Sequence, residues 1–346
     1  EFIELKNIGP GTLNLNLVEF TEGIHFTFPD VDLASGDHIV VVKDIAAFDA
    51  LYDIQTNNIN VAGRYTGSLA NNGERVRLQD AIGQTIQDFE YEDGWRSITD
   101  GDGFSLTIID PTNSDPNTWS QKDFWRASVY RYGSPDWDDS GILPNPGAVV
   151  INEVMAHSNA GPDWIELHNT TGAPIDIGGW FLSDNNRDEP NLMKYRIPDG
   201  TTIPLNGYIV FYEDTDFNNL SDPCCLIPFA LSENGDEACL SSAVDLYGRL
   251  TGYRQVEGFG ASQTNVSLGR YFKPSTGNYN FVAMDSSTPN SANANPKVGP
   301  VVINEIMYNP ISGNQNEEYI ELRNITGTFV TLYRYDKSAP WKFTDG

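Results

Sequence analysis

The sequence has few cysteines, few basic residues and no long hydrophobic run. Its 346 residues include three cysteines, too few for a disulfide framework, and the longest wholly aliphatic stretch, Ile39–Val42, is far too short to span a membrane. Lys and Arg number 21 against 48 Asp and Glu, which gives a formal net charge of −27. A protein with this excess of negative charge repels phosphate groups, so we do not expect it to bind nucleic acid. Because no hydrophobic run is long enough, we do not expect membrane insertion either.

Helical periodicity and catalytic signatures are scarce as well. No stretch of ten or more residues repeats convincingly with a 3.6-residue period, and Ile45–Tyr52 allows at most two helical turns. No Gly-rich phosphate loop, GxSxG elbow, HExxH motif or Cys–His arrangement occurs. What the chain does have is 12% aromatic residues, 31 Gly and 20 Pro, which indicate folded cores joined by many turns.

A repeat organises the whole chain. The segment Val149–Met155 returns as Val301–Met307 with six matches in seven, and each copy is followed by an Ile-Glu-Leu-x-Asn motif. The chain also opens on this motif, so Glu4, Glu166 and Glu321 are equivalent at spacings of 162 and 155 residues. A constant spacing over separated segments is the signature of tandem structural units.

The repeat predicts three units. Residues 1–143 form a unit that lacks its first strand, residues 148–295 form a complete unit, and residues 300–346 form the N-terminal part of a third. Within each unit the apolar residues alternate, as in Phe2–Lys6, or form short runs such as Tyr208–Tyr212, which we expect to be buried on both faces. Eight or nine short strands per unit predict an all-β fold of tandem antiparallel β-sandwiches.

These motifs resemble the lamin-tail domain in its bacterial secreted form. The resemblance rests on the Val-Ile-Asn-Glu and Ile-Glu-Leu-x-Asn pair at 150–169 and 302–324, on Gly178–Asp184, and on Leu-x-x-Asn-Gly at 69–73 and 231–235. It implies immunoglobulin-like sandwiches with an interaction role rather than catalysis. In bacteria such domains occur in exported proteins, as tandem arrays or beside secreted nucleases, phosphatases and adhesive modules.

We therefore expect a non-catalytic structural or adhesive protein, extracellular or at a cell surface. Its partners would be other copies of itself or cell-surface and matrix polymers, and it would require no cofactor. One alternative is the accessory region of a larger secreted hydrolase, such as a nuclease or phosphatase. Another is a carbohydrate-binding module.

Glu153 and Glu166 admit two interpretations. As a carboxylate pair on neighbouring strands, they resemble the acid and base of a glycosidase. Alternatively, they hold turns and strand ends together through hydrogen bonds. Because Glu305 and Glu321 reproduce the pair, and framework residues recur along an array while catalytic sites seldom do, the repeat favours the framework.

If a divalent ion binds, the segment Asp100-Gly-Asp102-Gly is the expected site, with Asp93 nearby. Carboxylates spaced by flexible glycines suit the oxygen shell of Ca²⁺. The rest of an EF-hand is absent, and the counterpart around Gln263–Asn265 has no carboxylate, which favours a simple turn. Calcium is therefore the only cofactor that the sequence suggests.

The cysteines predict one local bridge. Cys224, Cys225 and Cys239 lie in one stretch, and an exported chain permits disulfides, so we expect either member of the adjacent pair to bond to Cys239. A metal site built from three thiolates is the alternative, but no second CxxC and no nearby His supports it.

Two segments are candidate partner surfaces. The first is an aromatic and basic stretch peculiar to the first unit, with Trp125, Arg126, Tyr130 and Trp137. The second is the expected strand Val301–Tyr308.

The strand with Val302, Asn304 and Ile306 is suited to pairing with another chain. The first unit has no counterpart of Val149–Pro162, and a sandwich without an edge strand invites strand addition. One explanation is that the chain continues beyond both ends. The other is that Val301–Tyr308 of one copy completes the first unit of the next, which would give a head-to-tail fibre.

Overall fold

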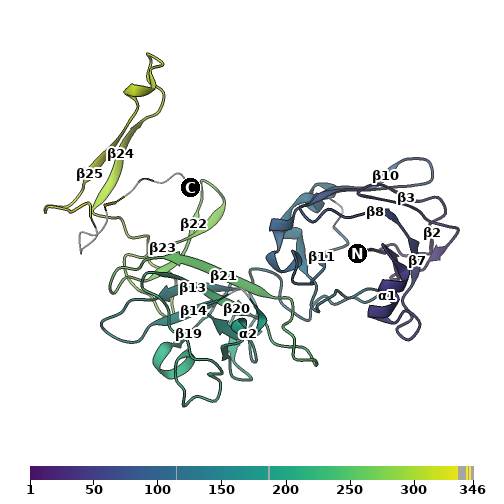
Figure 1. Ribbon diagram of the computed structural model, residues 1–346, viewed down its shortest axis with the longest axis horizontal. Coiled ribbons are helices and arrows are strands. Elements are labelled where there is room, and N and C mark those ends of the chain that lie inside the picture. The colour runs from purple at the N-terminus through teal and green to yellow at the C-terminus, as the bar shows by residue number, and fades with distance from the viewer. Residues whose placement is uncertain (114, 186–187, 334–339, 342, 344–346) are drawn as a thin grey trace.

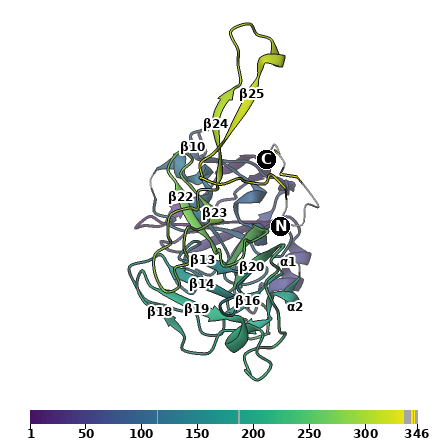
Figure 2. The same cartoon turned by 90° about the vertical axis from the view of Figure 1, so that its left-hand side faces the viewer.

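The chain forms two β-sandwich bodies in succession, followed by a hairpin that stands away from both (Figures 1 and 2). The computed structural model describes residues 1–113, 115–185, 188–333, 340–341 and 343. Almost all strand pairs are antiparallel, which confirms the predicted all-β class. In the described part of the chain, no helix is long and apolar enough to cross a membrane.

The first body contains the sheets β10-β9-β3-β4-β8 and β1-β6-β7, the small sheets β2-β5 and β11-β12, and, among its described residues, one α-helix and four short 3-10 helices. The helix α1 is the predicted short one, and its first turn is capped by the Asp44 side chain, which accepts a hydrogen bond from the N–H of Ala47 at 2.9 Å. The elements are β1 (Phe2–Lys6), β2 (Leu13–Asn14), β3 (Glu19–Glu22), β4 (Ile24–Thr27), β5 (Asp32–Leu33), β6 (His38–Val42), α1 (Ile45–Tyr52), β7 (Val61–Arg64), β8 (Thr66–Gly67), β9 (Glu74–Gln79), β10 (Thr85–Tyr91), β11 (Leu106–Ile108) and β12 (Trp125–Ala127).

The second body is a sandwich of a five-stranded sheet, β19-β14-β13-β22-β23, and a four-stranded sheet, β17-β16-β20-β21, with the small sheet β15-β18. Its elements are β13 (Val149–Met155), β14 (Trp164–Asn169), β15 (Ile175–Asp176), β16 (Phe181–Ser183), α2 (Glu189–Leu192), β17 (Tyr195–Arg196), β18 (Thr202–Ile203), β19 (Tyr208–Tyr212), β20 (Gly235–Ser241), β21 (Arg254–Gly260), β22 (Leu268–Lys273) and β23 (Asn278–Ala283).

One apolar core lies between the two large sheets of the second body. Ile151 and Ile165 enter it from one sheet, and Leu182 and Leu240 enter it from the other. All four side chains are completely buried, as the alternation of faces along a strand requires. The same rule places Cys239, the neighbour of Leu240, on the opposite face of β20.

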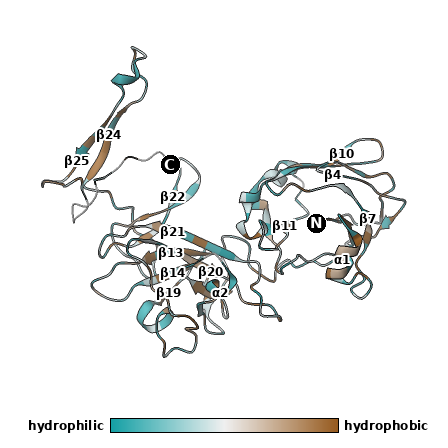
Figure 3. Ribbon diagram, viewed as in Figure 1, coloured by the Kyte–Doolittle hydropathy of each residue, from teal (hydrophilic) through white to brown (hydrophobic). Residues whose placement is uncertain are grey.

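The hairpin of β24 (Val301–Met307) and β25 (Tyr319–Asn324) repeats the β13–β14 pair in register. Glu305 lies opposite Glu321 as Glu153 lies opposite Glu166, and each first strand has a bulge just before its Glu. β24 is coloured largely hydrophobic in Figure 3, and yet Ile303 and Ile306 on β24, like Ile320 on β25, are exposed to solvent. In the predicted third unit, 300–346, residues 334–339, 342 and 344–346 lie outside the described part.

One strand prediction was wrong. Tyr208–Tyr212 forms β19 at the edge of its sheet, and only Phe211 is fully buried. An edge strand pairs with one neighbour only, so its apolar run is shielded less than the sequence pattern suggests.

Candidate functional site

Two glutamates lie side by side inside the second body. Glu153 on β13 and Glu166 on β14 are cross-strand partners, and neither side chain is exposed. A carboxylate removed from water is costly unless hydrogen bonds replace its hydration. The surroundings of this pair therefore decide what it does.

Glu153 fastens a closing turn to the sheet. It accepts hydrogen bonds from the Ser267 hydroxyl at 2.5 Å and from the Thr288 hydroxyl at 2.7 Å. The backbone N–H of Thr288 also donates to Glu153 Oε1 at 3.1 Å. Both Ser267 and Thr288 belong to segments that repeat in the sequence, so the signal for their role was present.

Glu166 binds the same turn at Asn290, two residues after Thr288. It accepts from the Asn152 amide at 2.7 Å and from the backbone N–H of Asn290 at 2.5 Å. Asn152 is the extra residue of the bulge in β13, and a bulge redirects a side chain in this way. The Asn152 amide also donates to Asn293 Oδ1 at 2.6 Å, a partner that the sequence did not reveal.

We call Asn152, Glu153 and Glu166, together with the turn 288–293 that they bind, the clamp. Burial raises the pKa of Glu166 to about 7, because desolvation opposes its charged form more strongly than its hydrogen bonds favour it. Since protein groups hold both carboxyls away from solvent, the clamp geometry favours the framework interpretation over a glycosidase pair.

Parts of the clamp recur in the other units. In the first body the backbone N–H of Asp136 donates to Glu4 Oε2, and burial raises the pKa of Glu4 to about 7. In the hairpin the Asn304 amide donates to Glu321. An Asn or backbone amide therefore binds the equivalent glutamate in every unit.

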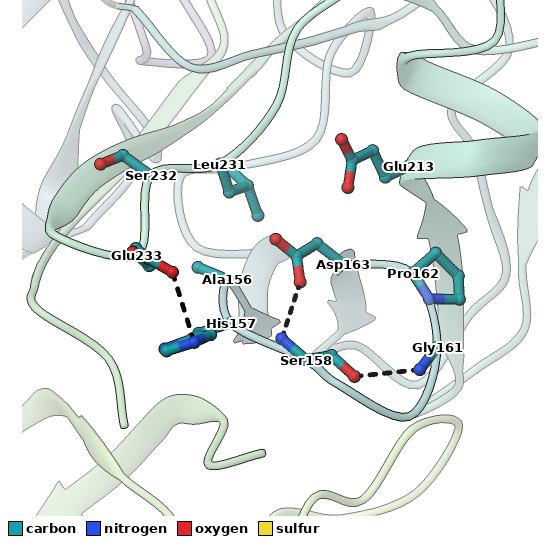
Figure 4. A pocket seen from close by; sticks show the side chains of 10 residues that line it. All are labelled: Ala156, His157, Ser158, Gly161, Pro162, Asp163, Glu213, Leu231, Ser232 and Glu233. Carbon is teal, nitrogen blue, oxygen red and sulfur yellow. Dashed lines mark hydrogen bonds and ion pairs between the residues drawn. The ribbon is translucent and has the colours of Figure 1, made fainter. Parts of the chain in front are cut away.

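A separate hollow of about 390 Å³ opens at one end of the second body (Figure 4). Asp163 lies inside it and accepts from the N–H of Ser158 at 3.2 Å, and His157 pairs with Glu233 at 3.3 Å. Burial, together with nearby Glu213, raises the pKa of Asp163 to about 6. This hollow was not predicted from the sequence.

The first body has a hollow at the equivalent place. Its lining includes Glu1 and Leu69, which align with Asp163 and Leu231 at the repeat spacing of 162. The two hollows are therefore a property of the repeated fold, and the carboxyl residue before each Ile-Glu-Leu strand marks them in the sequence.

The predicted calcium ligands do not converge. Asp102 forms an ion pair with Arg254 at 2.8 Å, whereas Asp93 and Asp100 line the hollow of the first body. Throughout the described residues, no three His, Cys, Asp or Glu side chains are grouped to hold a metal ion. A guanidinium group thus occupies the place next to Asp102 that a cation would need.

The predicted disulfide is wrong for this structure. Cys224, Cys225 and Cys239 are free thiols. Cys224 and Cys225 pack against the core between the sheets, whereas Cys239 points to the other face of β20 and packs beside Phe181. The sheet therefore separates the cysteines that the sequence placed together.

Half of the predicted aromatic surface is interior. Trp125 is 8% exposed and Arg126 is 7% exposed, so neither is available to a partner. Arg126 forms a buried ion pair with Asp139. Tyr130 and Trp137 stack on each other at 5.6 Å, and Trp137 remains half-exposed.

The predicted donor strand is accessible but already paired. Asn304 and Ile306 are exposed and Val302 is half-buried. All three lie on β24, which pairs with β25 of its own chain.

Comparison with known proteins bears on the second body. Residues 143–251 match the model of the Lamin Tail Domain, a match that includes the clamp residues Asn152, Glu153 and Glu166. The comparison with curated proteins found no match. The expected resemblance to the lamin-tail domain is therefore confirmed for residues 143–251, and the second body is an immunoglobulin-like sandwich similar to the Lamin Tail Domain.

Proposed function

We propose that this region is a non-catalytic extracellular repeat protein whose lamin-tail-type units serve a structural or adhesive role. The observation that carries the proposal is the recurrence of the amide–glutamate contact at Glu4, Glu166 and Glu321. A contact kept in every unit serves the units themselves, because each one must close its own sandwich.

The acidic composition supports an exterior location. A net charge of −27 on 346 residues is tolerated best where salt screens the repulsion between like charges. We expect the protein to bind cell-surface or matrix polymers, and the half-exposed Trp137 offers an aromatic face for them.

Protease treatment of intact cells that produce the protein tests the location. We expect the region to be cleaved in intact cells as completely as in lysed cells, with a cytosolic marker spared. Cleavage that occurs only after lysis would contradict the proposal.

An activity assay tests the non-catalytic part. The chain should hydrolyse glycosides, phosphate esters and DNA no faster than a Glu153→Gln, Glu166→Gln double variant does. Hydrolysis that the double variant loses while remaining folded would restore the glycosidase interpretation, and hydrolysis independent of both residues would indicate a separate active site.

Head-to-tail assembly by strand donation is a costlier arrangement than the sequence suggested. In the second body β13 uses one edge for β14 and the other for β22. β25 occupies the edge of β24 that strand β1 of another copy would need. Insertion of β24 into a first body therefore requires exchange of the whole β24–β25 ladder, so sedimentation at rising concentration should show a monomer.

A further inference from the structure

The two sandwich bodies meet through backbone as well as side chains. The loop that follows β12 approaches the strand connection before β21, and the N–H of Gly252 donates to the carbonyl oxygen of Val129 at 2.9 Å. A Cβ atom at Gly252 would lie 1.8 Å from the carbonyl oxygen of Ser128. Only glycine fits this contact.

Two ion pairs flank the backbone contact. Arg254 of the second body binds Asp102 of the first at 2.8 Å, and Arg131 of the first binds Glu189 of the second at 3.0 Å. The side chain of Arg254 is only 9% exposed, whereas that of Asp102 is 46% exposed, so water screens this pair from the Asp102 side. The charges cross the interface in opposite directions, which fixes its orientation.

Glu189 also braces the surface that receives the first body. Its second carboxylate oxygen accepts the backbone N–H of Leu250 at 2.7 Å, close to Gly252. The guanidinium of Arg249 lies 5.8 Å from the centre of the Tyr132 ring, within the range of a cation–π contact.

The docking loop is itself held in shape. Asp139 accepts from the N–H of Val129 at 2.6 Å and from the Ser134 hydroxyl at 2.8 Å, and it pairs with buried Arg126. A loop that is ordered before it docks loses little conformational freedom on docking. The buried residues of the predicted partner surface therefore shape a loop whose partner lies in the same chain.

The interface residues are not part of the repeat. At the spacing of 162, Gly252 and Arg254 align with Glu90 and Glu92, and Asp102 aligns with Thr264. Neither the glycine nor the charge pair is kept, so the contact is particular to these two units.

We infer that the surface of the second body around Gly252, Arg254 and Glu189 is a docking site for the 128–139 loop of the first. The docking joins the two bodies into one rigid block. The inference deepens the proposed structural role, since a fixed joint transmits force and orientation between units, but its test does not depend on where the protein is located.

The test compares Gly252→Ala with Gly258→Ala in the full chain. Gly258 lies on β21, the strand that begins just after Gly252, and a Cβ atom at Gly258 would meet nothing within 4 Å. Gly258→Ala is therefore a matched control. We expect Gly252→Ala to raise the radius of gyration in X-ray scattering and to speed hydrogen exchange in residues 126–132. Loss of one hydrogen bond corresponds to up to about tenfold in such an opening equilibrium.

A second variant covers misfolding of Gly252→Ala. Asp102→Asn combined with Arg131→Gln removes both ion pairs and leaves the apolar core of each body untouched. Like Gly252→Ala, this double variant should raise the radius of gyration and speed hydrogen exchange in residues 126–132. If both variants have the radius of gyration and the exchange rates of the wild type, the inferred joint between the bodies is wrong. This conclusion holds whatever the outcome of the location experiment.

Discussion

Glu166 shows how one ionisable residue can link stability to pH. Its pKa is raised to about 7 in the folded chain, above the ordinary value of 4.5, so the folded state holds the proton more tightly. The resulting stabilisation is complete below about pH 4.5 and is lost as pH rises through about 7. Glu4, whose pKa is also raised to about 7, acts in the same direction.

The first prediction follows from this sign. Between pH 5 and 8 the free energy of unfolding should fall less steeply in Glu166→Gln than in the wild type, because Gln imitates the protonated side chain. Each unit of pKa shift is worth about 1.4 kcal/mol, so the effect should be on the order of 1 kcal/mol or more. Denaturant titrations across this range measure it.

Glu318→Gln is the control, since Glu318 is exposed and lies outside the clamp. Equal pH slopes in Glu166→Gln and the wild type would show that the Glu166 proton is not coupled to folding.

At the level of single elements, β20 decides the state of the cysteines. Its alternation sends Ala238 and Leu240 into the main core and Cys239 to the other face. The sequence contained this alternation, but proximity along the chain suggested a bridge instead. Knowing which face a cysteine occupies requires the position of the second sheet, which no local pattern supplies.

The second prediction concerns these thiols. Titration of the unfolded, unreduced chain should find three free thiols, whereas a bridge would leave one. In the folded chain Cys239 should react far more slowly than Cys224 at pH 8, because burial raises the pKa of Cys239 to about 12. Cys239→Ser should remove only the slow phase of the reaction.

The repeated strand pairs, unlike the state of the cysteines, were predictable from the sequence. The pairs β13–β14 and β24–β25 follow directly from two copies of one motif, and even their bulges coincide. The edge position of β19 and the role of Asn293 were not predictable, because both depend on contacts between residues that lie 40 or more positions apart in the chain.

At the scale of the whole molecule, the two main features are the excess of negative charge and the joint between the two bodies. The excess of acidic residues was evident from composition. The joint was not predictable, since Gly252 is one of 31 glycines and only the approach of Ser128 distinguishes it.

The third prediction separates general screening from calcium binding. Millimolar CaCl₂ and an ionic-strength-matched NaCl control should raise the melting temperature equally, because Arg254 already pairs with Asp102. Asp102→Ala should lower the melting temperature slightly in both salts. A calcium-specific increase that Asp102→Ala abolishes would show that the carboxylate leaves Arg254 to bind the ion.

The central claim is that the buried glutamates close each sandwich, and hydrogen exchange of residues 288–293 tests it most directly. The clamp predicts that Asn152→Ala speeds exchange at Thr288 and Asn290 and lowers the free energy of unfolding by about 1–3 kcal/mol. Asn159→Ala, at an exposed position outside the clamp, should leave both unchanged. Exchange at 288–293 that is the same in Asn152→Ala and Asn159→Ala would contradict the clamp.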